Sequence, residues 1–238
     1  MKRAILKALR AARAAKRPVA LVTNLESGRQ GLLDGGAVTG DLTLGGPVLR
    51  QVERALAEDR SGALEGTSLF VHVFNPPLRM IVVGAVHIAQ ALVPMAALAG
   101  YDVIVVDPRR AWASGARFPD VKPLTDWPDE AMQALAPDRR TAVVTLTHDP
   151  KLDDPALAEA LRSPAFYIGA LGSTRTHAKR LARLRELGFG EDDLARVHGP
   201  IGLAIGAKSP AEIALSILAQ ATQVLHGAPS LVRAEAAQ

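Results

Sequence analysis

The 238-residue sequence contains no cysteine. This absence excludes disulfides, thiolate nucleophiles, cysteine-ligated zinc and iron–sulfur clusters within the chain. Aromatic residues are also scarce, at 4% of the composition, and the net charge is only +4. A nucleic-acid-binding protein usually combines a strong excess of lysine and arginine with aromatic side chains on which bases stack. We therefore expect no nucleic-acid partner.

Long apolar runs are missing as well. No segment approaches the roughly 20 apolar residues that span a bilayer, so no membrane partner is expected. Basic residues interrupt the N-terminal stretch where a signal peptide would be apolar. This stretch could be a transit peptide or lie on a membrane surface, but its apolar residues share one helix face, which favours a helix docked on the protein. Those residues are Ile5, Leu6, Leu9 and Ala12. We expect a cytoplasmic protein.

What is present is an apolar content of 48%, enough for one large domain or two small ones. The pair Pro76-Pro77 interrupts the pattern and predicts a boundary between a small domain over 1–77 and a larger one over 78–238. The first part predicts an α+β domain. Its expected elements are a helix to about Arg17, an extended segment after Pro18, short hairpins in 28–46, a helix over 47–60 and a strand over 67–75.

From Arg79 onwards, apolar strands alternate with helices. Four strands are expected, in the runs RMIVVGA, DVIVVD, TAVVTLTHD and AFYIGALG. The helix after the third strand is expected to begin with Asp154 as N-cap, and the last helix with a Ser209–Glu212 capping box. This alternation predicts an α/β fold, a Rossmann-like parallel sheet covered by helices on both faces. Ligands of such sheets bind outside the carboxyl ends of the strands.

The stretch MIVVGAVHIAQAL is close to a dinucleotide-binding turn. Gly84 opens the turn, but Val86 stands where the second glycine would let a pyrophosphate approach the backbone. Asp107 ends the next strand, where a ribose-binding acid would stand; the alternative is a surface or N-capping Asp. His87 falls in the first helical turn, where a neutral imidazole either hydrogen-bonds a ligand or packs against the turn.

Two later strand ends carry further candidate residues. His148 and Asp149 end the third strand, either as ligand-facing groups or as turn residues. The fourth strand leads through Gly169 and Gly172 into a helix start suited to phosphate; its polar residues are Ser173 and Arg175. The following basic side chains, Lys179, Arg180, Arg183 and Arg185, are expected to form a solvated face. The histidines lack metal-ligand spacing, so no metal site is predicted.

The order of these motifs over residues 79–226 resembles the XdhC/CoxI family of maturation factors for molybdenum hydroxylases, such as xanthine and carbon monoxide dehydrogenases. The matching segments are GAVHIAQAL with DVIVVDPR, TLTHDPKLDD, AFYIGALGSTRTHAKRLARL and GPIGLAIGAKSPAEIALSILA. The N-terminal segment resembles a shortened version of the small first domain of the family.

The resemblance implies a chaperone rather than an enzyme, with no catalytic residues. Its cargo would be molybdenum cofactor, as molybdopterin or its dinucleotide form, sulfurated with a cysteine desulfurase and inserted into an apo molybdenum hydroxylase. A homodimer is expected on the same ground. Carried over by motif, the cofactor-binding residues are Gly84, His87, Asp107, His148, Asp149, Gly169, Gly172, Ser173 and Arg175.

Two departures from the family pattern keep other functions open. The family loop reads GAGH where this chain has Val86, and GGC where it has Ala37, so no thiol stands there. A specialised member that works beside a fuller paralogue would fit both changes. The alternatives are an NAD(P)-dependent oxidoreductase, suggested by Gly84 and Asp107, and a ligand-free protein–protein adaptor.

Overall fold

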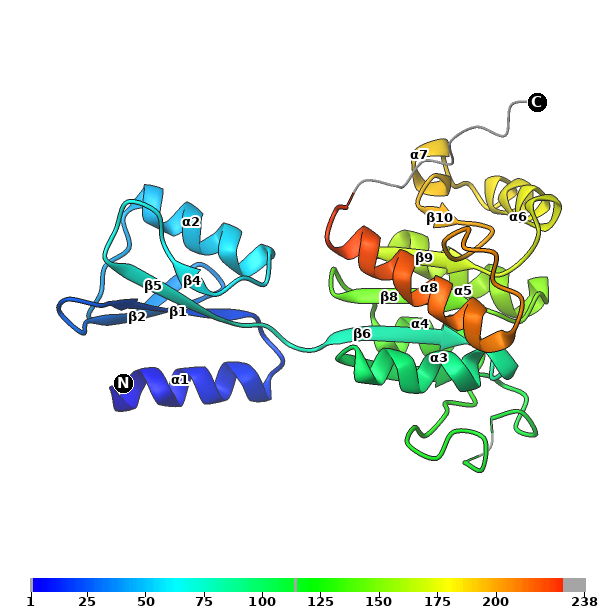
Figure 1. Cartoon of the computed structure of the whole chain (residues 1–238), viewed down its shortest axis with the longest axis horizontal. Helices are drawn as coiled ribbons and strands as arrows, with labels where there is room; N and C mark the ends of the chain where they lie inside the picture. Colours follow the sequence, from blue (N-terminus) through cyan, green and yellow to red (C-terminus); the bar gives the residue numbers. More distant parts are fainter. Residues whose placement is uncertain (1, 114, 229–238) are drawn as a thin grey trace. The chain divides into compact units, whose positions relative to one another are not determined.

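The computed structural model describes residues 2–113 and 115–228. The chain divides between Pro76 and Pro77 into two compact units, each with its own sheet and helices (Figure 1). The expectation for 78–238 includes residues 229–238, which lie outside the described part. Within the described part, no helix is both long and apolar enough to cross a membrane.

The N-terminal unit is a five-stranded antiparallel sheet with strand order β3-β2-β1-β5-β4. A helix covers each of its faces (Figure 1). Its elements are α1 (Arg3–Ala14), β1 (Val19–Asn24), β2 (Gln30–Asp34), β3 (Ala37–Gly40), α2 (Gly46–Ala57), β4 (Gly62–Ala63) and β5 (Leu69–Phe74). The predicted small α+β unit is confirmed.

Alternation along β1 explains why both faces are covered. Val19 and Leu21 pack in the apolar cluster with α1, while Ala20 and Val22 pack in the cluster with α2. Successive side chains of a strand point to opposite faces, so an apolar run must be buried on both sides. The predicted docking of the first helix is confirmed, since Ile5, Leu9 and Ala12 are its buried residues; Leu6, by contrast, is 45% exposed.

The C-terminal unit is a five-stranded parallel sheet with strand order β10-β9-β8-β6-β7. The predicted Rossmann-like α/β fold is confirmed. Its strands are β6 (Leu78–Val83), β7 (Tyr101–Val106), β8 (Thr141–Thr145), β9 (Tyr167–Ala170) and β10 (Val197–His198). Its helices are α3 (His87–Leu98), α4 (Pro128–Leu135), α5 (Pro150–Arg162), α6 (Thr174–Glu186), α7 (Glu191–Leu194) and α8 (Pro210–Leu225).

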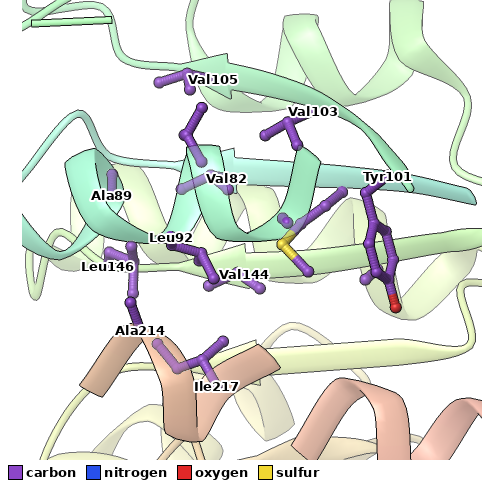
Figure 2. Close-up of a cluster of buried hydrophobic side chains, with 14 of the residues drawn as sticks. Val82, Ala89, Leu92, Tyr101, Val103, Val105, Val144, Leu146, Ala214 and Ile217 are labelled. Atoms are coloured by element: carbon purple, nitrogen blue, oxygen red, sulfur yellow. The ribbon is translucent and has the colours of Figure 1, made fainter. Parts of the chain in front are cut away.

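Two apolar layers sandwich this parallel sheet. One layer joins the sheet to α3 and α8, and Figure 2 shows Leu92 and Ile217 facing Val82 and Val144 across it. The other layer joins the opposite face of the strands to α4, α5 and α6. Strands that are buried on both faces have continuous apolar sequences, which is why four of these strands could be predicted from the sequence.

The connections place a crossover point between β6 and β8. The chain runs from β6 outward to the edge strand β7, then returns to the central strand β8 on the other side of β6. Ligands of open parallel sheets gather at the carboxyl ends of the strands near such a point. Here Gly84 (φ +111°) follows β6, and a Cβ on it would lie 2.7 Å from the Thr147 methyl group. The two strand ends therefore pack in direct contact.

Two sequence expectations were wrong in detail. Helix α5 begins at Pro150 with Asp149 as its N-cap, and Asp154 lies more than one turn inside the helix. The chain offers two Asp-Pro pairs here, and the helix uses the first, although Pro155 must then sit within it without an N–H to donate. The two-residue strand β10 was missed because an apolar pattern needs more residues to be visible. The Ser209–Glu212 capping box is confirmed.

Substituting Gly84 tests the contact between the strand ends. We expect Gly84→Ala to lower the free energy of unfolding by about 2–4 kcal/mol, because a side chain meets both an unfavourable φ and the Thr147 methyl group. Gly188→Ala is the matched control, since Gly188 also has a positive φ (+93°) but faces open space. Equal losses in urea unfolding of the two variants would contradict the packing argument.

Candidate functional site

A pocket of about 310 Å³ lies at the carboxyl ends of β8 and β9, between the N-terminal turns of α5 and α6. The positive ends of two helix dipoles therefore face the same space. Its walls carry four cationic side chains and one buried carboxylate. The lining residues are His148, Pro150, Asp153, Arg175, Thr176, Lys179, Arg180 and Arg183. This set is suited to an anion.

The turn after β8 forms one wall of the pocket. His148 adopts a left-handed conformation (φ +62°), which is uncommon for a residue with a side chain. Asp149 follows it as the N-cap of α5 and accepts a hydrogen bond from the Lys151 amide at 2.9 Å. His148 is thereby turned toward the pocket, whereas the carboxylate of Asp149 is used for capping.

Asp153 fixes this turn from inside α5. Its carboxylate accepts hydrogen bonds from the Thr147 hydroxyl (2.6 Å), the Thr147 amide (3.3 Å) and the His148 amide (3.1 Å). Only 1% of the side chain is exposed. Burial raises the pKa of Asp153 above its usual value, even though the hydrogen bonds from Thr147 and the charge of Arg180 favour the ionised form.

Arg180 is the buried cation of the pocket. Its side chain is only 2% exposed, and Nη2 donates to the Leu171 carbonyl at 2.8 Å and lies 3.7 Å from Asp153 Oδ2. Within the described residues, Nε and Nη1 are buried without a hydrogen-bond partner. Burial lowers the pKa of Arg180, while Asp153 and Asp154 act in the opposite direction. Two buried donor nitrogens, which carry three N–H groups, are thus left unused at the pocket wall.

Three other cations complete the site. Arg183 makes a bidentate contact with Asp154, while Arg175 and Lys179 are exposed. The hydrogen bond to Asp154 is the main cause that raises the pKa of Arg183. Ser173 caps α6 by accepting from the Thr176 amide at 3.2 Å. The pocket therefore combines a buried cation with exposed cations on long aliphatic side chains at its mouth.

The expectation that Lys179, Arg180, Arg183 and Arg185 form a solvated face was wrong for two of them. Arg180 is buried, and Arg183 is held by Asp154. A helical stripe could have revealed the buried position, because Arg180 stands four residues before the buried Leu184. No comparable signal in the sequence separates Asp153 from the neighbouring acidic residues.

Asp107 lies apart from the pocket lining and is already engaged by its own chain. Its carboxylate is fully buried and accepts from the Ala85 amide (2.8 Å) and, through both oxygens, from Arg109. Burial alone would raise the pKa of Asp107, but the hydrogen bonds from Arg109 and Ala85 outweigh it and lower the pKa. The surface or N-capping role considered for Asp107 is therefore wrong, and the geometry leaves no free oxygen for a ribose.

The remaining candidates lie outside the pocket lining. His87 is exposed at the start of α3, with Nδ1 3.2 Å from the Gln90 side chain. Gly169 is buried in β9, where a Cβ would lie 2.5 Å from the Ile201 side chain. Gly172 (φ +147°) precedes α6, and a Cβ there would lie 3.8 Å from Arg180 Nη1. Of the sequence candidates, His148 and Arg175 line the pocket.

The described residues contain no cluster of three or more acidic, histidine or cysteine side chains that could hold a metal ion. The charged groups that line the pocket are four cations and the carboxylate of Asp153. Such a set is suited to an anionic group rather than to a metal ion.

Comparison with known proteins finds a family and several relatives that this chain resembles. The family model of the XdhC Rossmann domain matches residues 80–221. The chain is 34% identical over 184 residues to the uncharacterized protein YqeB of Escherichia coli K12, which covers 77% of this chain and 34% of YqeB. It is 34% identical over 154 residues to the molybdenum cofactor insertion chaperone PaoD of the same organism, covering 64% of this chain and 42% of PaoD.

Two further matches come from bacilli. The chain is 31% identical over 158 residues to a probable xanthine dehydrogenase subunit of Bacillus subtilis 168, covering 66% of this chain and 46% of that protein. A crystal structure described as a xanthine dehydrogenase from Bacillus halodurans matches with a TM-score of 0.71 and 26% identity, covering 94% of this chain and 65% of the other. The chain spans between about a third and just under half the length of the curated relatives.

Removing the charge of Arg180 tests its coupling to Asp153. In the folded state burial favours the protonated carboxyl, so the contribution of Asp153 to stability is full below its unfolded pKa of about 3.8 and is lost as pH rises through the raised folded pKa. Arg180→Met removes an attractive charge and raises that pKa further. We expect a loss of about 3 kcal/mol at pH 7 that becomes smaller at pH 4, measured by urea unfolding.

Arg196→Met is the matched control for this experiment. Arg196 also donates to buried backbone, at the carbonyls of Leu161, Ser163 and Ala165, without a carboxylate partner among those contacts. Its loss should therefore be the same at pH 4 and pH 7. A pH-independent loss for Arg180→Met would show that packing rather than charge coupling accounts for its role.

Proposed function

Because the chain belongs to the family defined by the XdhC Rossmann domain, we propose that it is a maturation factor that binds molybdenum cofactor and supports its insertion into a molybdenum hydroxylase. The relative PaoD is a molybdenum cofactor insertion chaperone, which supports the proposal. The cofactor would be cargo, held and passed on. The matched relatives are longer than this chain, so the proposal concerns the activity of the segment they share.

The observation that carries the proposal is the cation-lined pocket between α5 and α6. Molybdopterin ends in a phosphate monoester, and its dinucleotide form carries two phosphates that bridge the pterin to a nucleoside. Helix N-termini and arginine side chains are the groups that bind phosphate in proteins. Arg175 and Lys179 at the mouth and Arg180 inside would hold that end of the cargo, while the pterin end faces the carboxyl edge of the sheet.

The proposal extends to sulfuration of the bound cofactor with a cysteine desulfurase. This chain has no cysteine and carries Ala37 where the family pattern has a thiol. Sulfur therefore cannot be carried on a side chain of this protein. It would pass from the desulfurase to the cofactor directly, or through a fuller paralogue that supplies the thiol. Homodimerisation and the identity of the hydroxylase belong to the same proposal.

The geometry gives the oxidoreductase alternative no support. Asp107, its proposed ribose ligand, is bound on both oxygens by Ala85 and Arg109. In addition, the Arg117 guanidinium donates to the Ala85 carbonyl at 2.8 Å and covers the turn that a dinucleotide would approach. The experiment below distinguishes the adaptor function from cofactor binding.

We expect saturable binding when the purified protein is titrated with molybdenum cofactor, and no saturable binding of NAD or NADP at millimolar concentration. Arg175→Ala should weaken cofactor binding about tenfold, because it removes a charge-assisted hydrogen bond. Arg185→Ala is the control, since Arg185 lies on the same helix but pairs with Glu191 away from the pocket.

A second readout is the activity of an apo molybdenum hydroxylase supplied with the loaded protein. Activation should require the bound cofactor. Failure of both cofactor binding and activation would refute the proposal. A stable complex with the hydroxylase that contains no cofactor would instead establish the adaptor function.

A further inference from the structure

The pocket between α5 and α6 has more positive charge than its own carboxylates neutralise. Four cations surround it, and two carboxylates, Asp153 and Asp154, contact Arg180 and Arg183. Two positive charges are left over when the histidine is neutral. Net charge of this size inside a partly enclosed site favours an anion that carries two negative charges.

The unused donors point to the same conclusion. Arg180 Nε and Nη1 are buried and have no partner among the described residues. A buried guanidinium is stable when its N–H groups are all bonded, so acceptor atoms for both of these nitrogens are missing at the pocket wall. Gly172 lies beside this side of the guanidinium, since a Cβ at that position would be in van der Waals contact with Nη1, at 3.8 Å.

We propose that this pocket is a site for a terminal phosphate monoester dianion, anchored on Arg180, that discriminates against phosphodiesters. A monoester ends in three free oxygens and carries nearly two charges at neutral pH. Two of its oxygens fit the unused donors of Arg180, and the third fits Arg175 or Lys179 at the mouth. A diester has only two free oxygens and one charge, so it leaves one positive charge unneutralised.

The inference rests on the proposed function only for the name of the natural ligand. Molybdopterin ends in a phosphate monoester, whereas in the dinucleotide form that phosphate is one half of a pyrophosphate. It then has two free oxygens and one charge of its own, and the second charge lies on the neighbouring phosphate. The pocket should therefore favour molybdopterin over the dinucleotide form. The chain would then receive its cargo without the nucleotide.

Methyl phosphate and dimethyl phosphate are the probes that test the site on the full chain. In a phosphate-free buffer of low ionic strength, phosphorus NMR titration should give saturable binding of methyl phosphate, at least tenfold tighter than that of dimethyl phosphate. The double variant Arg175→Ala/Lys179→Ala, altered only at exposed positions, should lose most of this binding. Arg185→Ala should retain it, because Arg185 pairs with Glu191 outside the pocket.

Arg180→Met should abolish methyl phosphate binding in a protein whose circular dichroism shows it to be folded. If that variant does not fold, the exposed double variant still decides the question. Equal affinity for the two probes, or undiminished binding by the double variant, would overturn the proposal.

Competition separates this inference from the proposed function. Saturating methyl phosphate should displace bound molybdopterin, and molybdopterin should bind at least tenfold more tightly than its dinucleotide form. Cofactor binding that is undisturbed by methyl phosphate would refute the phosphate site and leave the maturation role standing. Binding of methyl phosphate by a protein that binds no cofactor would confirm the anion site and refute the maturation role.

Discussion

The buried carboxylate of Asp153 joins the turn after β8 to the helix that follows β9. It accepts two hydrogen bonds from Thr147 and one from His148, and it faces the guanidinium of Arg180. Transfer of an ionised carboxylate out of water is unfavourable unless hydrogen bonds and an opposite charge compensate it. Asp153 has these partners, whereas Arg180 has an acceptor only for Nη2 among the described residues. Its Nε and Nη1 therefore remain without hydrogen-bond partners at the edge of the sheet.

The same edge explains why a valine is acceptable in the turn after β6. In dinucleotide-binding turns, backbone N–H groups meet a phosphate, and glycine keeps the approach open. Here the Ala85 amide donates to Asp107, so a carboxylate of the chain itself already occupies the first of these donors. Val86 has an extended conformation (φ −86°) as the N-cap of α3 and needs no glycine. Under the proposed function, the anion would bind at the start of α6, where the capping serine and the cations lie, and not at the start of α3.

Most of the fold could be predicted from the apolar runs and the capping residues of the sequence. The four long strands were predicted because burial on both faces requires continuous apolar residues, and the start of α8 because Ser209 and Glu212 form a recognisable capping box. The start of α5 was misplaced because Asp149-Pro150 and Asp154-Pro155 offer the same local signal. Only the packing of the helix on the sheet decides between them. The partner of Arg180 was hidden for a similar reason: the spacing of Arg180 and Leu184 marks a buried stripe of α6, but nothing local identifies the aspartate on another helix that Arg180 faces.

The charges that line the pocket are matched to an anion. Arginine stays protonated in proteins, and Asp153 is engaged by three donors from the turn. Under the proposed function, the exposed Arg175 and Lys179 would extend the positive field into solvent, where it would accelerate encounter with the anionic cargo and be screened by salt. Arg180 would act only at short range and out of water, so it would govern how long the cargo stays. An acceptor that releases the cargo would then have to offer its phosphate group stronger neutralisation than a buried arginine with two unpartnered nitrogens.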